Sequence, residues 1–160
     1  MAARIVPEGG WESRLKPKRT PRVKNDRHRQ FVKQLPCICC LIERGAEIQA
    51  DDPMHIRSGS DLHGKDWAGG AQTSDDRWTL PGCRPHHNEQ HAAGDELRFW
   101  ARWGVDPHLL ALVLWGLTGN HHEAVLVLRI HAARAGALRR VVDRMGGDSD
   151  DSAEDAQATS

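Results

Sequence analysis

The apolar residues of this chain follow a helical period on either side of a middle segment that lacks one. Near the start, "DRHRQFVKQL" predicts a short helix with Asp26 as its N-cap, which has to end before Pro36. After Pro85, "HHNEQHAAGDELRFWARWG" is helical in composition, with an interruption at Gly94 and an end at Gly104.

Two further helices are predicted beyond that point. "DPHLLALVLWGLTG" opens with Asp106 as N-cap and Pro107 at the first helical position, and it closes at Gly116 or Gly119. The last helix, over 120–145, has a capping box and one apolar face, formed by Asn120, Glu123, Val125, Leu128, Ala132 and Ala135. These helices are expected to supply most of the buried surface.

The middle segment, from Cys37 to Cys83, is rich in Gly, Asp and Ser and shows no helical period. It predicts short strands joined by long loops. Within it, "DPMHIRSG" places His55 on a predicted strand, between Met54 and Ile56. A loop-rich region of this length inside a compact domain needs something other than apolar packing to hold it, and a bound metal would serve.

Composition adds a charge asymmetry to this picture. The chain has 160 residues, 39% of them hydrophobic, and no formal net charge. The segment 14–33 nevertheless carries nine basic residues against the single acid Asp26, whereas the chain after Met145 carries five acids and no base. The basic segment favours a polyanionic partner, and the acidic end is best interpreted as a disordered, solvated tail.

No apolar leader precedes the charged start, and the longest apolar run, "LLALVLWGL", is too short to cross a bilayer. We therefore expect a soluble, cytoplasmic protein without a membrane partner. In that compartment its four cysteines are expected to be metal ligands or reduced thiols rather than disulfides.

Two of these cysteines form a Cys-x-x-Cys pair, Cys37 and Cys40, and a second pair with the same spacing is formed by Cys83 and His86. Two such pairs far apart in sequence are how small domains build a closed tetrahedral zinc site. The alternative is a set of ordinary buried thiols near a coincidental histidine. Cys39 is left over, and it could compete with Cys40 as the ligand.

The doubled histidine after Pro85 indicates a second centre. Residues four apart on a helix share a face, so His87 and His91 point the same way while His86 points elsewhere. His55 could be an interior residue, or it could approach this pair as a base beside a metal. Asp75 or Asp76 could orient a histidine or bind metal through water.

In this order, the segments "LPCICC", "HIRSGS", "HGK" and "DDRWTLPGCRPHHNEQHAAGDELRFWARWGVDP" resemble the HNH endonucleases of the His-Me finger superfamily. The chain is most similar to a phage and prophage family of small HNH-like proteins, which the RecA-dependent recombination-enhancement nuclease resembles. The resemblance covers roughly residues 28–135. It implies an α+β fold: a small ββα-metal finger with a structural zinc, long loops and C-terminal helices.

The same resemblance implies roles for individual residues. His55 would be the general base, oriented by Asp76, and His87 and His91 would hold a single catalytic cation such as Mg²⁺. The predicted phosphate contacts are basic: Arg57, Lys65, Arg77 and Arg84.

Two positions depart from the HNH pattern. Met54 stands where many HNH enzymes have a metal-ligating Asp or His, so the cation would have only two protein ligands unless Asp75, Asp76 or His63 joined them. The loop "GGAQTS" also lacks the lysine that related proteins often carry there.

The predicted organisation is a flexible basic arm (1–25), a zinc-stapled HNH core (26–104), a helical extension packed on it (105–145) and a disordered acidic tail (146–160). The leading hypothesis is a metal-dependent DNA endonuclease with little sequence preference, with a host recombinase as a further candidate partner. The alternatives are a catalytically decayed, zinc-stapled DNA-binding or recombination-accessory module, and a structural zinc domain without a nucleic-acid partner.

The remaining aromatic and histidine side chains divide into two groups. Most are expected in the core or on helix surfaces, without a chemical role: Trp78, Phe99, Trp100, Trp103, His108, His121, His122 and His131. Trp67, in a Gly-rich loop, is left open as a residue that could stack on a base.

Overall fold

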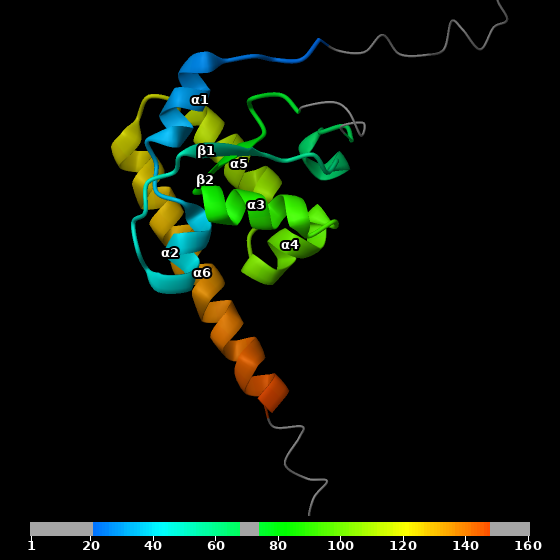
Figure 1. Ribbon diagram of the computed structural model, residues 1–160, viewed down its shortest axis with the longest axis vertical. Helices are drawn as coiled ribbons and strands as arrows, with labels where there is room; N and C mark the ends of the chain where they lie inside the picture. Colours follow the sequence, from blue (N-terminus) through cyan, green and yellow to red (C-terminus); the bar gives the residue numbers. More distant parts are fainter. Residues whose placement is uncertain (1–20, 68–73, 148–160) are drawn as a thin grey trace, which may run out of the picture.

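The computed structural model describes residues 21–67 and 74–147 (Figure 1). Most of the predicted basic arm, the acidic tail beyond Gly147 and all but the last residue of the "GGAQTS" loop lie outside the described residues. The described chain is a mixed α+β structure in which helices surround a two-stranded antiparallel sheet. The α+β prediction is therefore confirmed.

The sheet pairs β1 (Asp52–His55) with β2 (Thr79–Gly82), with Met54 opposite Leu80 and His55 opposite Thr79. The helix α3 (Arg84–Ala92) begins directly after β2, with Pro85 in its first turn, where the missing N–H costs nothing. A short 3₁₀ helix, η2 (Asp61–His63), lies in the long connection between the strands.

The first helix, α1 (Asp26–Lys33), confirms the prediction except at its cap. The side chain of Asn25, not that of Asp26, accepts the hydrogen bond from the His28 amide, and Asp26 lies in the first turn. A second helix, α2 (Ile38–Arg44), was not predicted, because its buried residues are apolar at four consecutive positions and show no amphipathic period.

The predicted helix after Pro85 is divided at the glycine, as expected. Gly94, with φ of +70°, separates α3 from α4 (Glu96–Trp103), and the Asp95 side chain caps α4 by accepting from the Arg98 amide. A φ in this region is strained for residues with a Cβ, so glycine fits the break. Gly104, with φ of +67°, ends α4.

The C-terminal helices also follow the prediction. In α5 (Pro107–Gly116), the Asp106 carboxylate accepts hydrogen bonds from the amides of His108 and Leu109. The last helix, α6 (His121–Gly147), packs on α2, and its C-terminal part extends beyond the rest of the fold (Figure 1). On its predicted apolar face Leu128, Ala132 and Ala135 are buried, while Val125 is partly buried.

The core is continuous from α1 and α2 through the sheet to α4, α5 and α6. Trp78, Phe99, Trp100 and Trp103 are buried in it, as predicted. Within residues 21–67 and 74–147, no helix is long and apolar enough for a transmembrane span.

Candidate functional site

Two of the predicted pairs come together in a buried cluster of three cysteines and one histidine, here called the zinc cluster: Cys37, Cys40, Cys83 and His86. Cys37 directly precedes α2 and Cys40 lies within it, while Cys83 precedes α3 and His86 lies in its first turn. The two helix starts thus bring the ligands together from segments more than 40 positions apart.

The spacing within the zinc cluster suits a tetrahedral ion. The Cys40 and Cys83 sulfurs are 3.7 Å apart, and the His86 Nδ1 lies 3.6, 3.4 and 3.2 Å from the sulfurs of Cys37, Cys40 and Cys83. For Zn–S bonds of about 2.3 Å and a Zn–N bond of about 2.0 Å, tetrahedral geometry requires about 3.8 Å between sulfurs and about 3.5 Å between sulfur and nitrogen. The four side chains can therefore hold a metal such as zinc.

Cys39 is buried beside these ligands but is not one of the four that converge. Its thiol donates to Cys37, which lowers the pKa of Cys37 to about 4, whereas that hydrogen bond and burial raise the pKa of Cys39. Burial raises the pKa of Cys40 to about 12. A metal bound here has to displace protons, so its affinity is expected to fall as the pH falls.

The second constellation begins with His55, at the end of β1. Its Nε2 lies 3.2 Å from Oδ1 of Asp76, which is fully buried. Since an ionised carboxylate can only accept, the His55 Nε2 carries the proton and Nδ1 keeps a lone pair. The predicted contact between Asp76 and His55 is therefore present.

Asp76 is held by a second set of partners that the sequence did not indicate. Its carboxylate accepts from Arg22 Nη2 at 2.8 Å and from the Asn25 amide at 2.8 Å, and Arg29 Nε lies 3.5 Å away. The segment before α1 is thereby fixed to the loop that carries the carboxylate. These basic residues belong to the stretch that was predicted to meet a polyanion.

These contacts set the protonation of both groups. Burial opposes ionisation of Asp76, but hydrogen bonds from the Asn25 amide, His55 and Arg22 outweigh it, so its pKa lies below the usual value. For His55, burial is the largest influence and lowers the pKa below 6.5, against the opposing effect of Asp76. His55 is therefore neutral at pH 7.

His87 and His91 share a face of α3, as predicted, and their Nε2 atoms are 3.0 Å apart. Two imidazole nitrogens bound about 2.1 Å from one ion at adjacent octahedral positions would be separated by about 3.0 Å. The Asp52 carboxylate lies 3.3 Å from the His87 Nδ1, on the far side of that ring. The two atoms are not hydrogen-bonded to each other, so this approach is an ion pair only when His87 is protonated, and the sequence did not reveal it.

The suggested additional ligands lie elsewhere. Asp76 is engaged with His55 and the arginines, Asp75 accepts from Arg77, and His63 is grouped with Asp106 and His108. Met54 is fully buried against Gly82. In the part of the chain that the structure describes, no third His, Cys, Asp or Glu joins His87 and His91 in a cluster that could hold an ion.

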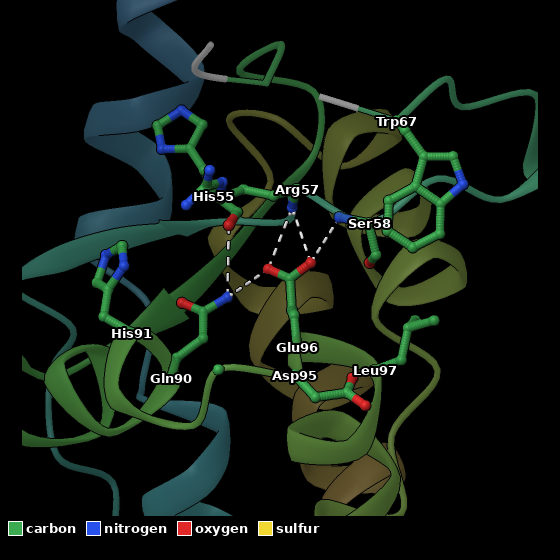
Figure 2. Close-up of a pocket in the computed structure, with 10 residues that line it drawn as sticks. His55, Arg57, Ser58, Trp67, Gln90, His91, Asp95, Glu96 and Leu97 are labelled. Carbon is green, nitrogen blue, oxygen red and sulfur yellow. Dashed lines mark hydrogen bonds between the residues drawn. The ribbon is translucent and has the colours of Figure 1, made fainter. Parts of the chain in front are cut away.

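His55 and His91 both line one pocket of about 400 Å³, whose residues are drawn in Figure 2. Glu96 lies in the wall of this pocket, where its carboxylate accepts hydrogen bonds from the amides of Arg57 and Ser58 and from the Gln90 side chain. Gln90 also donates to the His55 carbonyl at 3.4 Å, so α3, α4 and the end of β1 are tied together at this wall.

Trp67 lies across the pocket from His91 (Figure 2) and is 70% exposed. Its indole lies against Gly59, where a Cβ would come within 2.5 Å of the ring. The side chain is therefore both held by the backbone and open to a ligand, and its predicted role in stacking stays open.

The four predicted phosphate contacts have different environments. Arg57 is exposed and lines the pocket, and Arg84 is exposed beside Asp52, 2.7 Å from its carboxylate. Arg77 is half-buried over Trp78 and donates to Asp75. Lys65 departs from the prediction, because it is buried and its ammonium donates to the carbonyls of Arg57 and Asp66.

Comparison with known proteins gives a family without an assigned activity. Residues 1–115 match the family described as "Protein of unknown function (DUF968)". A curated relative, the uncharacterized protein YdfU of Escherichia coli, is 38% identical over 107 residues, which cover 66% of this chain but 26% of the relative. No solved structure matches. Because the family match spans most of the chain, the protein belongs to the DUF968 family.

Proposed function

We propose that this protein is a metal-dependent DNA endonuclease of the HNH type that hydrolyses phosphodiester bonds with little sequence preference. One observation carries the proposal: His55, hydrogen-bonded to a buried carboxylate, lines the same pocket as His91, whose ring nitrogen lies 3.0 Å from that of His87. This is the combination of a base and a pair of metal ligands that phosphodiester hydrolysis requires.

In the proposed reaction His55 accepts a proton from a water molecule through Nδ1, and the resulting hydroxide attacks the phosphorus in line with the 3′ oxygen. The bond from phosphorus to that oxygen breaks, and the oxygen takes a proton from solvent. A divalent cation on His87 and His91 would supply Lewis-acid stabilisation of the scissile phosphate and the leaving oxygen.

The surroundings of His55 favour this role. Its lowered pKa keeps the imidazole unprotonated at neutral pH, so it is ready to accept a proton without prior deprotonation. Asp76 fixes the tautomer and stabilises the imidazolium once it forms. Asp76 is itself held by Arg22 and by the Asn25 amide, so the position of the carboxylate that orients the base does not depend on a single contact.

DNA is the proposed substrate because the exposed cations beside the pocket suit a phosphate backbone. Arg57 lines the pocket and Arg84 lies at the start of α3, next to the residues that would hold the cation. Contacts of this kind give affinity without reading the sequence. A host recombinase as a partner, a phage or prophage role and a cytoplasmic location extend this proposal, and they rest on the resemblance alone.

A second candidate is a zinc-stapled DNA-binding or recombination-accessory module whose catalytic centre has decayed. The observation that favours it is the small number of protein ligands for the catalytic cation. Met54 is buried in the core, and within the described residues no third His, Cys, Asp or Glu joins His87 and His91. Under this alternative the protein binds DNA but does not cut it.

Plasmid nicking in the presence of Mg²⁺, Mn²⁺ or Ni²⁺ separates the two. We expect the folded, zinc-loaded wild type to nick DNA, His55→Ala and His91→Ala to lose activity, and His122→Ala, altered at an exposed site on α6, to keep it. A wild type that binds DNA but is inert with every cation would support the decayed module instead.

A further inference from the structure

A third group of potential ligands lies where the loop after β1 meets the start of α5. It consists of His63, from the 3₁₀ helix η2, and of Asp106 and His108, from the first turn of α5. One ligand atom from each lies within 4.8 Å of the others. This trio is separate from the zinc cluster and from His87 and His91, and neither the family match nor the proposed nuclease mechanism uses it.

Each of the three side chains uses one of its polar atoms in a hydrogen bond with the protein. The other nitrogen or oxygen of each side chain can then bind a metal. The His108 Nε2 lies 2.9 Å from the Ser58 carbonyl oxygen, so it carries the proton and donates, and Nδ1 keeps a lone pair. The His63 Nδ1 lies 2.9 Å from the Ser60 hydroxyl, which leaves Nε2 toward Asp106. Metal-binding histidines are commonly oriented in this way by a carbonyl or hydroxyl on the other ring nitrogen.

The two carboxylate oxygens of Asp106 also have different surroundings. Oδ1 of Asp106 accepts the amides of His108 and Leu109 as the N-cap of α5, whereas Oδ2 lies 3.8 Å from the His63 Nε2. That separation is too long for a hydrogen bond, and it lies within the range of an ion pair only when His63 is protonated. With His63 neutral, a metal ion between the two atoms would hold them together.

We propose that His63, Asp106 and His108 bind a transition-metal ion such as Zn²⁺. Two imidazoles and a carboxylate suit Zn²⁺, Co²⁺ or Ni²⁺ better than Mg²⁺ or Ca²⁺, which prefer oxygen ligands. The His108 side chain is buried, but the Asp106 side chain is 47% exposed, so the ion keeps a face open to water and can exchange.

The ion would fasten the loop between the strands to α5. That loop contributes Arg57 and Ser58 to the pocket that His55 lines, and Ser58 is also the residue whose carbonyl orients His108. Occupancy of the site is therefore expected to stiffen one wall of the pocket. The proposal does not depend on the nuclease function, since it concerns binding alone.

Cobalt binding tests it, because the two kinds of site have different spectra. A site with three thiolates, such as the zinc cluster, gives a strong charge-transfer band from thiolate to Co²⁺, whereas a site of nitrogen and oxygen ligands gives weak visible bands only. The titration is made on full-length His91→Ala protein that holds one equivalent of zinc, in the zinc cluster, so that the trio is left open and His87 and His91 do not contribute. We expect a further Co²⁺ ion to bind without a thiolate band.

Two substitutions test whether the additional Co²⁺ ion is bound by this trio. Asp106→Asn keeps a good N-cap but removes the anionic ligand, and His63→Ala removes a ligand from the loop. Each should weaken Co²⁺ binding by more than about tenfold, since even the partners that orient metal ligands contribute about 10–100-fold. The matched controls, Asp95→Asn at the N-cap of α4 and His122→Ala on α6, should leave it unchanged.

The proposal is overturned if the His91→Ala protein that holds one equivalent of zinc binds no further Co²⁺. It is also overturned if both Asp106→Asn and His63→Ala retain the additional ion with unchanged affinity. Either result leaves the nicking experiment unaffected, so failure here and failure of the proposed nuclease are distinguishable.

Discussion

Replacing one of two adjacent buried cysteines separates metal binding from packing at the zinc cluster. Cys39 and Cys40 are neighbours in α2, and each is at most 1% exposed, yet only Cys40 directs its sulfur at Cys83 and His86. Cys40→Ser removes a ligand, whereas Cys39→Ala removes a thiol of similar burial that does not face the ion. The second variant is therefore the control for the first.

The expected difference follows from the size of the zinc contribution. Structural zinc sites supply about 10–16 kcal/mol of binding free energy that is coupled to folding, which is about 2.5–4 kcal/mol for each of four ligands. Loss of the Cys39 sulfur should cost about 1 kcal/mol of buried contact. For a chain of this length about 1 kcal/mol shifts Tm by about 2–4 °C, so Cys40→Ser should melt roughly 5–16 °C lower and Cys39→Ala only a few degrees lower.

The assay is thermal unfolding with and without a chelator, together with zinc content of the purified chains. We expect the wild type and Cys39→Ala to hold zinc and to lose stability when chelated, and Cys40→Ser to hold less and respond less. The assignment of Cys40 as a ligand would be refuted if Cys40→Ser kept its zinc while Cys39→Ala lost it.

Three further expectations concern the centre around His55. Asp76→Asn should lower nicking by about 10–100-fold while zinc content is unchanged, because the base loses its orienting carboxylate; an unchanged rate would contradict that role. Since only unprotonated His55 can act as base and burial lowers its pKa, nicking should rise with pH to a plateau, with its midpoint below pH 6.5; a midpoint well above that value would contradict the burial effect. Gly82→Ala should reduce the free energy of unfolding in urea by about 1–3 kcal/mol, because a Cβ there would come within 2.6 Å of the Met54 sulfur; unchanged stability would show that the strand pair can absorb it.

Features that depend on neighbouring positions in the sequence could be predicted. The two ligand pairs of the zinc cluster each have fixed spacing, so their convergence at the starts of α2 and α3 agrees with expectation. The helix break at Gly94 and the N-cap at Asp106 could also be predicted, because each depends on residues that are close in the sequence. Helix α2 was missed because it is short and its buried residues are consecutive, which leaves no period to detect.

Contacts between distant segments could not be predicted. The ion pair of Arg22 and Asp76 joins positions 54 apart, and no local pattern specifies which acid a basic residue will meet. The approach of Asp52 to His87 depends on how the sheet packs against α3. Lys65 was predicted to contact phosphate, but it is buried, and backbone carbonyls in its own loop accept hydrogen bonds from its ammonium.

Imidazole rescue of a His55→Gly variant is the most direct test of the claim that His55 is a base beside the cation held by His87 and His91. The His55 side chain is partly exposed and lines the pocket, so a small imidazole can enter the space that the substitution leaves. The account predicts that His55→Gly is inactive alone, that added imidazole restores nicking, and that the same addition does not restore His91→Ala. Nicking by His55→Gly at the wild-type rate without imidazole would contradict it.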